Sequence, residues 1–156
     1  MSEEIERKYL VYKDKLPILK NGTLFIQGYL SIEPHFRVRI IGNKVIIGIK
    51  NIIKDGKSRN EWEFEKKLNK EEIKSLLNLC IEKPIEKIRY NIKHKDLIWE
   101  IDEYQADNKG LITADVELPY IDYPIDFPDW INISKEITHN PKYFNTNLGK
   151  HPYCNW

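Results

Sequence analysis

The chain of 156 residues has the length of one ordinary domain, and with 41% hydrophobic residues it has enough apolar side chains for a core. Its 25 Lys and Arg residues balance 24 Asp and Glu residues, so the formal net charge is +1 and nucleic acid is not an expected partner. The absence of a long apolar run, of a signal-like start and of any disulfide or zinc-finger spacing leaves one soluble, cytoplasmic domain over residues 1–156 as the expectation.

Eight segments are predicted as β-strands: most alternate charged with apolar residues, which is the period of a strand, whereas Thr23–Leu30 is less charged and Val45–Lys50 is mostly apolar. In chain order they are Glu4–Val11, Thr23–Leu30, His35–Ile40, Val45–Lys50, Arg59–Glu65, Glu86–Tyr90, Leu97–Asp102 and Ala114–Leu118. After the fifth, Asn69 and Glu72 have the spacing of a capping box and predict the start of a helix. A second helix is predicted from Asp129 to about Thr138. The sequence therefore predicts a mainly β (α+β) fold with a few flanking helices.

The charged phase of these strands is compatible with two arrangements. In the first, a half-buried antiparallel sheet turns its charged face to solvent, where each cross-strand ion pair contributes only ~0–1 kcal/mol. In the second, eight strands close into a barrel and the charged phase lines its interior. Because charge is costly to bury without partners, such an interior would hold paired ions and an anionic ligand. The pattern by itself leaves both arrangements open.

Basic and acidic residues gather on different strands. The basic pairs are Arg37/Arg39 and Lys87/Arg89, and the acidic pairs are Glu4/Glu6, Glu100/Asp102 and Asp115/Glu117. Arg and Lys bind phosphate oxygens, whereas carboxylates are hard ligands for Mg²⁺ or Mn²⁺. Separate basic and acidic walls therefore favour a polyphosphate ligand held together with a divalent metal ion. The sequence has no P-loop and no Gly-x-Ser-x-Gly motif, so neither a Walker-type site nor a serine nucleophile is indicated.

The opening Glu4-x-Glu6-x-Lys8 resembles the Glu-x-Glu-x-Lys signature of the CYTH superfamily, the triphosphate tunnel metalloenzymes. Further elements of that family follow in the same order: Gln27-Gly28-Tyr29-Leu30, Arg37-x-Arg39, Lys50, Arg59-x-Glu61-x-Glu63, Lys87-x-Arg89, Glu100-x-Asp102, Asp115-x-Glu117 and Lys142-Tyr143-x-Asn145. The resemblance covers nearly the whole chain and implies an eight-stranded antiparallel β-barrel tunnel with Mg²⁺- or Mn²⁺-dependent action on triphosphates. Among family members, the chain most resembles the short bacterial proteins that hydrolyse inorganic tripolyphosphate to phosphate and pyrophosphate.

The resemblance also implies a role for each charged residue of the pattern. Triphosphate oxygens are expected to be bound by Lys8, Arg37, Arg39, Lys50, Arg59, Lys87 and Arg89. Metal ions are expected at Glu4, Glu6, Asp102, Asp115 and Glu117, with Glu61, Glu63 and Glu100 in support. Crowding among cations should lower the pKa of Lys8 or Lys87, so that one of them helps in proton transfer, and Tyr29 is expected to bond a terminal phosphate.

Three other functions remain open at this level. Hydrolysis of thiamine or nucleoside triphosphates would need an aromatic or apolar cradle beside the tunnel mouth, and cyclisation of ATP would need an anchored adenine. A non-catalytic polyphosphate sensor would gain from fewer carboxylates, whereas every acidic pair is present here. A homodimer is compatible with the family, although no interface is readable from the sequence.

Overall fold

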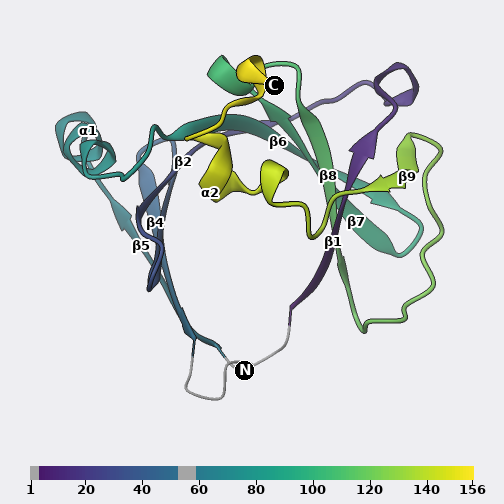
Figure 1. Ribbon diagram of the computed structural model, residues 1–156, viewed down its shortest axis with the longest axis horizontal. Coiled ribbons are helices and arrows are strands. Elements are labelled where there is room, and N and C mark those ends of the chain that lie inside the picture. The colour runs from purple at the N-terminus through teal and green to yellow at the C-terminus, as the bar shows by residue number, and fades with distance from the viewer. Residues whose placement is uncertain (1–3, 53–58) are drawn as a thin grey trace.

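The computed structural model describes residues 4–52 and 59–156, which form one antiparallel sheet with short helices around it. Its strands are β1 (Ile5–Val11), β2 (Thr23–Ser31), β3 (His35–Ile41), β4 (Lys44–Ile52), β5 (Arg59–Lys67), β6 (Ile85–His94), β7 (Leu97–Tyr104), β8 (Ile112–Leu118) and β9 (Ile131–Glu136). Their order in the sheet is β5-β4-β3-β2-β6-β7-β8-β1-β9, and Figure 1 shows the sheet curled into an arch. The predicted mainly β fold, with eight strands at the predicted places, is confirmed.

The sheet contains a ninth strand where the sequence pattern predicted a helix. The prediction of a helix from Asp129 to about Thr138 is wrong, because Ile131–Glu136 pairs with the end of β1 as strand β9. β-Branched Ile alternates there with polar residues, a pattern that suits a strand once a partner edge is available. Since β9 occupies one edge of β1 at Tyr9–Val11, hydrogen bonds between the described strands leave β5 and β9 as edges and do not close the sheet into a full barrel.

Helix α1 (Lys70–Asn78) covers the outer side of β2, β3 and β4. Its predicted capping box is confirmed: Glu72 N donates to Asn69 Oδ1 at 2.9 Å, and Asn69 N donates to Glu72 Oε1 at 3.1 Å. The apolar stripe of Ile73, Leu76 and Leu77 packs against a buried cluster made of Val38, Ile40 and Val45. These three residues belong to the strand phase opposite to Arg37 and Arg39, so the helix holds the apolar side of the sheet.

A second apolar cluster lies behind β1, β7 and β8. Trp99 is fully buried at the centre of this cluster. The centroid of its ring lies 6.1 Å from that of Tyr9, 5.8 Å from that of Trp130 and 6.1 Å from that of Phe127. Ile101, Ala114 and Val116 complete it from the same strand phase. The long connection 119–130 supplies the cover, so the apolar phase of these strands is buried away from the charged phase.

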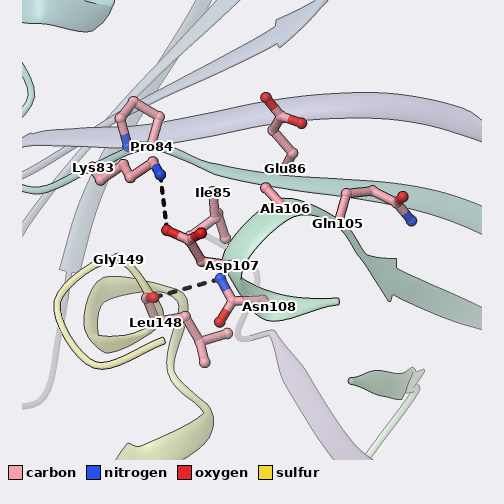
Figure 2. Close-up of a pocket in the computed structure, with 10 residues that line it drawn as sticks. All are labelled: Lys83, Pro84, Ile85, Glu86, Gln105, Ala106, Asp107, Asn108, Leu148 and Gly149. Atoms are coloured by element: carbon pink, nitrogen blue, oxygen red, sulfur yellow. Dashed lines mark hydrogen bonds and ion pairs between the residues drawn. The ribbon is translucent and has the colours of Figure 1, made fainter. Parts of the chain in front are cut away.

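In the C-terminal segment, η3 (Pro141–Tyr143) and α2 (Asn145–Leu148) lie under the arch in Figure 1, and the chain then runs to the top of the arch, where η4 (Tyr153–Asn155) lies beside the C-terminus. Leu148 is buried against Ile85 and Tyr104 of the sheet. Asn108, in η2 (Ala106–Asn108), ties the segment down by donating to Leu148 O at 3.5 Å and accepting from Tyr153 N at 2.8 Å. Figure 2 shows the crevice at this junction, and an exposed ion pair between Lys83 and Asp107 spans it. The crevice lies where the C-terminal segment packs against the sheet.

One more 3₁₀ turn, η1 (Lys13–Lys15), follows β1. Within residues 4–52 and 59–156, none of the helices has the length and apolar character needed to cross a membrane.

Candidate active site

The pairing register places the charged phases of β1 to β8 on one face of the sheet. Antiparallel partners lie side by side on the same face, and the register pairs Lys8 with Asp115, Arg89 with Asp102, Gln27 with Arg39, and Lys50 with Glu61. The residues that share this face are Glu6, Lys8, Arg37, Arg39, Lys50, Glu61, Glu63, Lys87, Arg89, Glu100, Asp102, Asp115 and Glu117. The opposite face carries the apolar clusters around Trp99 and Val38, so the charged face is the inner side of the arch.

A buried ion triad forms the floor of this face between β6 and β7. Asp102 accepts hydrogen bonds from Lys87 Nζ at 2.9 Å, from Arg89 Nε at 2.7 Å and from Arg89 Nη2 at 2.9 Å. Arg89 Nη1 also lies 2.7 Å from Glu100 Oε2. Lys87 and Asp102 are only 2% and 0% exposed, so for these two residues paired charge takes the place of water.

Electrostatics holds the triad in its ionised form. Burial alone would raise the pKa of the Asp102 carboxyl, but Lys87 and Arg89 overcome it and lower that pKa to about 2. Burial lowers the pKa of the Lys87 ammonium, and Asp102 opposes this effect. The pKa of Arg89 is raised because its bonds to Asp102 outweigh its burial. The shift in Lys87 has the direction predicted for it from crowding among cations, although burial is its larger cause.

Asp115, on the neighbouring strand β8, has a different environment. It is 4% exposed, its Oδ1 has no hydrogen-bond partner, and its nearest cation is Lys8 Nζ at 3.6 Å. Burial, reinforced by the charges of Asp102 and Glu6 and opposed by Lys8, raises the pKa of Asp115 to about 7. Glu6 and Glu117 are cross-strand neighbours beside it, and both are exposed. This end of the face therefore presents carboxylates that are not saturated by cations.

The basic strands β3 and β4 form the other wall, facing the carboxylates of β5. Arg39 Nη2 lies 3.4 Å from Glu63 Oε2, and Lys50 Nζ lies 3.7 Å from Glu61 Oε1. Burial, with the nearby charge of Arg37, lowers the pKa of Arg39. Gly48 stands across from Arg37, and a Cβ added there would make ordinary van der Waals contact with Arg37 Nη2 at 3.7 Å.

Comparison with known proteins identifies the family to which this geometry belongs. An inorganic triphosphatase of Acetivibrio thermocellus is 38% identical over 159 aligned residues, which cover 100% of this chain and 99% of that protein. The chain belongs to the CYTH superfamily. The inorganic triphosphatase NE1496 has a similar crystal structure, with a TM-score of 0.70 and 25% identity over 96% of this chain and 95% of that one.

A more distant fold match to this CYTH protein is HpAC1 from Hippeastrum, an adenylyl cyclase candidate with a dominant triphosphatase activity. It has a TM-score of 0.51 and 13% identity over 76% of this chain and 80% of that one. This match supports the fold alone. No family model matches the chain.

The CYTH fold brings most of the predicted residues together, with some exceptions. Glu4 precedes β1 and is exposed, and the side chain of Arg59 lies outside the described part of the chain. Tyr29 Oη accepts from Gln27 Nε2 at 3.0 Å, and the centre of its ring lies 5.3 Å from that of His35, with the two rings tilted by 48°. Among the described residues, no three His, Cys, Asp or Glu side chains converge in a way that could hold a metal ion by themselves.

Tyr104 is a buried residue of the charged face that sequence reasoning missed, and Gln27, which is also buried there, was named only as part of a family element without a role. Tyr104 Oη donates to Asn145 Oδ1 at 2.7 Å, and Lys87 Nζ lies 5.9 Å above its ring. Burial raises the pKa of Tyr104 well above its ordinary value, so the phenol remains a donor. The strand period was the available signal, because Tyr104 continues the phase of Glu100 and Asp102.

Proposed function

We propose that this protein hydrolyses inorganic tripolyphosphate to phosphate and pyrophosphate on the charged inner face, with a divalent metal ion. The observation that carries the proposal is the register, which sets basic and acidic strands side by side on one inward-facing surface. Support also comes from the Acetivibrio relative, which is named an inorganic triphosphatase and matches over its whole length. The enzyme class that follows is a triphosphatase, a hydrolase of phosphoanhydride bonds.

The acidic end of the face fits a divalent cation. Mg²⁺ in phosphoryl-transfer sites usually takes one or two carboxylates together with substrate phosphates, so it needs no complete protein cage. Asp115 has a buried oxygen without a hydrogen bond, and Glu6 and Glu117 flank it. These residues would hold the ion together with phosphate oxygens of the substrate, with Glu4 as a further candidate. When bound, the ion would neutralise charge on the phosphate oxygens and help to orient the attacking water.

The basic strands would orient the triphosphate. Arg37, Arg39 and Lys50 would bind equatorial oxygens along one wall, and Arg89 would bind from the floor. Lys8 is the better placed of the two candidate lysines for proton transfer, since its side chain is 17% exposed, whereas that of Lys87 is 2% exposed and held by Asp102. Fixed cations of this kind stabilise charge that develops as the terminal P–O bond breaks.

Phosphate release from tripolyphosphate, ATP and thiamine triphosphate, each with Mg²⁺, Mn²⁺ or EDTA, tests the proposal. We expect rapid release from tripolyphosphate that EDTA abolishes, with slower release from the organic triphosphates. Equal or faster turnover of an organic triphosphate would refute the substrate assignment. Turnover that survives EDTA would refute the metal dependence.

A matched pair of arginine variants separates the inner face from the protein in general. Arg39→Ala removes an inner-face guanidinium and should lower kcat/KM about 10-fold or more, as for loss of a charge-assisted hydrogen bond. Arg7→Ala removes an arginine from the opposite face, where it pairs with Glu136 at 2.7 Å. The Arg7 variant should keep kcat/KM within about twofold, and an equal loss in both variants would contradict the assignment of the face.

A further inference from the structure

Both carboxylate oxygens of Asp102 are already engaged by cations. Oδ1 accepts from Arg89 Nε, and Oδ2 accepts from Arg89 Nη2 and Lys87 Nζ, at 2.7, 2.9 and 2.9 Å. A carboxylate offers about four lone-pair positions, so most of its accepting capacity is used. The two oxygens make a bidentate fork with the guanidinium, which fixes its plane as well as its position.

A metal ion at Asp102 would have to displace these contacts. Mg²⁺ approaches its oxygen ligands to about 2.0–2.1 Å, and here that space borders two positive groups. Asp115 offers the opposite situation, because its Oδ1 has no hydrogen bond and its nearest ammonium is 3.6 Å away. The two buried aspartates of the face are therefore not equivalent, although the family resemblance grouped them together as metal ligands.

Within the triad only Arg89 reaches open space. Its side chain is 18% exposed, whereas those of Lys87 and Asp102 are 2% and 1% exposed. Arg89 lines a groove together with Lys20, Thr23 and Asn91, and its guanidinium carbon lies 5.2 Å above the Phe25 ring. A guanidinium has five N–H donors, and the bonds to Asp102 and Glu100 leave others for a ligand.

We propose that Asp102 is a positioning residue that fixes the Arg89 guanidinium to receive a triphosphate oxygen, and that it does not ligand the metal ion. Lys87 completes the arrangement from behind, because its ammonium balances the second carboxylate oxygen and keeps Asp102 in place. This inference rests on the proposed function, since it names the part of the same face that orients the triphosphate.

Two equilibrium measurements test the role of Asp102 without any turnover. Calorimetry with EDTA present gives the Kd for tripolyphosphate, and electron paramagnetic resonance gives the Kd for Mn²⁺ alone. Both are measured for the wild type, Asp102→Asn, Arg89→Ala and the double variant, with Asp115→Asn as the reference for a lost metal ligand. We expect Asp102→Asn to weaken tripolyphosphate binding about 10-fold and to leave the Kd for Mn²⁺ unchanged.

The double variant shows whether Asp102 acts through Arg89. In the Arg89→Ala background, Asp102→Asn should change the Kd for tripolyphosphate by less than about twofold, because the residue that it positions is absent. A full effect in that background, or weakened Mn²⁺ binding comparable to that of Asp115→Asn, would overturn the inference. If Asp102→Asn does not fold, the Kd values for tripolyphosphate and Mn²⁺ are measured for Asp102→Glu instead, which keeps the charge but displaces the carboxylate. A wild type that binds no tripolyphosphate would also overturn the inference, and the absence of phosphate release with Mg²⁺ or Mn²⁺ as well would refute the proposed function.

Discussion

Replacing Asp115 by Asn is expected to make the protein more stable at pH 8 and to impair hydrolysis. Burial raises the pKa of Asp115 to about 7 in the folded protein, compared with 3.8 for an ordinary Asp. Between these two values the folded chain keeps a proton that the unfolded chain has released. The contribution of Asp115 to the free energy of unfolding therefore falls as the pH rises from about 4 to about 7, and it stays constant above that.

The size of this effect follows from the two pKa values. They differ by about three pH units, and each unit corresponds to about 1.4 kcal/mol, so ionising Asp115 costs the folded protein about 4 kcal/mol at pH 8. About 3 kcal/mol of this cost arises between pH 5 and pH 8. Asn has nearly the same shape and no proton to release, so the variant avoids the cost.

Urea unfolding followed by tryptophan fluorescence, at pH 5 and pH 8 with EDTA present, measures the effect. EDTA is needed because a cation bound to Asp115 would itself stabilise the folded state. Glu117→Gln is the matched control, since it removes an exposed carboxylate two residues further along β8 and should change stability by no more than about 0.5 kcal/mol. If the free energy of unfolding falls by the same amount between pH 5 and pH 8 in the wild type and in Asp115→Asn, the reasoning is refuted.

Three further predictions concern stability. Because the pKa of Asp102 is lowered to about 2, its ion pairs stabilise the fold fully above pH 4, and about 2 kcal/mol of the free energy of unfolding should be lost as the pH falls toward 2. Urea unfolding midpoints measured over this acid range check the prediction, because Asp102→Asn should lack this loss. Trp99→Ala should cost about 3–5 kcal/mol, because the ring is fully buried among Tyr9, Phe127 and Trp130; a change under 1 kcal/mol in urea unfolding would show that the site collapses. Gly149→Ala would place a Cβ 2.5 Å from Lys83 O, so it should loosen the C-terminal segment and destabilise the protein by about 1–3 kcal/mol. Amide hydrogen exchange should become faster at Leu148 and Tyr153, while the cluster around Trp99 stays protected.

Much of the charged face was readable from the sequence because strand phase is a local property. Arg37 and Arg39 fall on one side of their strand and Val38 on the other, whatever the strand pairs with. The same holds for Glu100 and Asp102 against Trp99 and Ile101. Eight strands, the capped helix at Asn69 and the list of inward residues all follow from such local patterns.

Only the tertiary structure decided how those residues divide the work. Asp102 and Asp115 have the same side chain and the same strand phase, yet the pairing of β7 with β6 gives Asp102 two cations, while the pairing of β8 with β1 gives Asp115 a single lysine at 3.6 Å. Their pKa values of about 2 and about 7 follow from these partners. The strand β9 arises in the same way, from a free edge of β1 that no local pattern reveals. Register, curvature and burial join segments that lie far apart in the chain, so the sequence determined which face is charged, and the pairing of distant strands determined which of its charges are free to act.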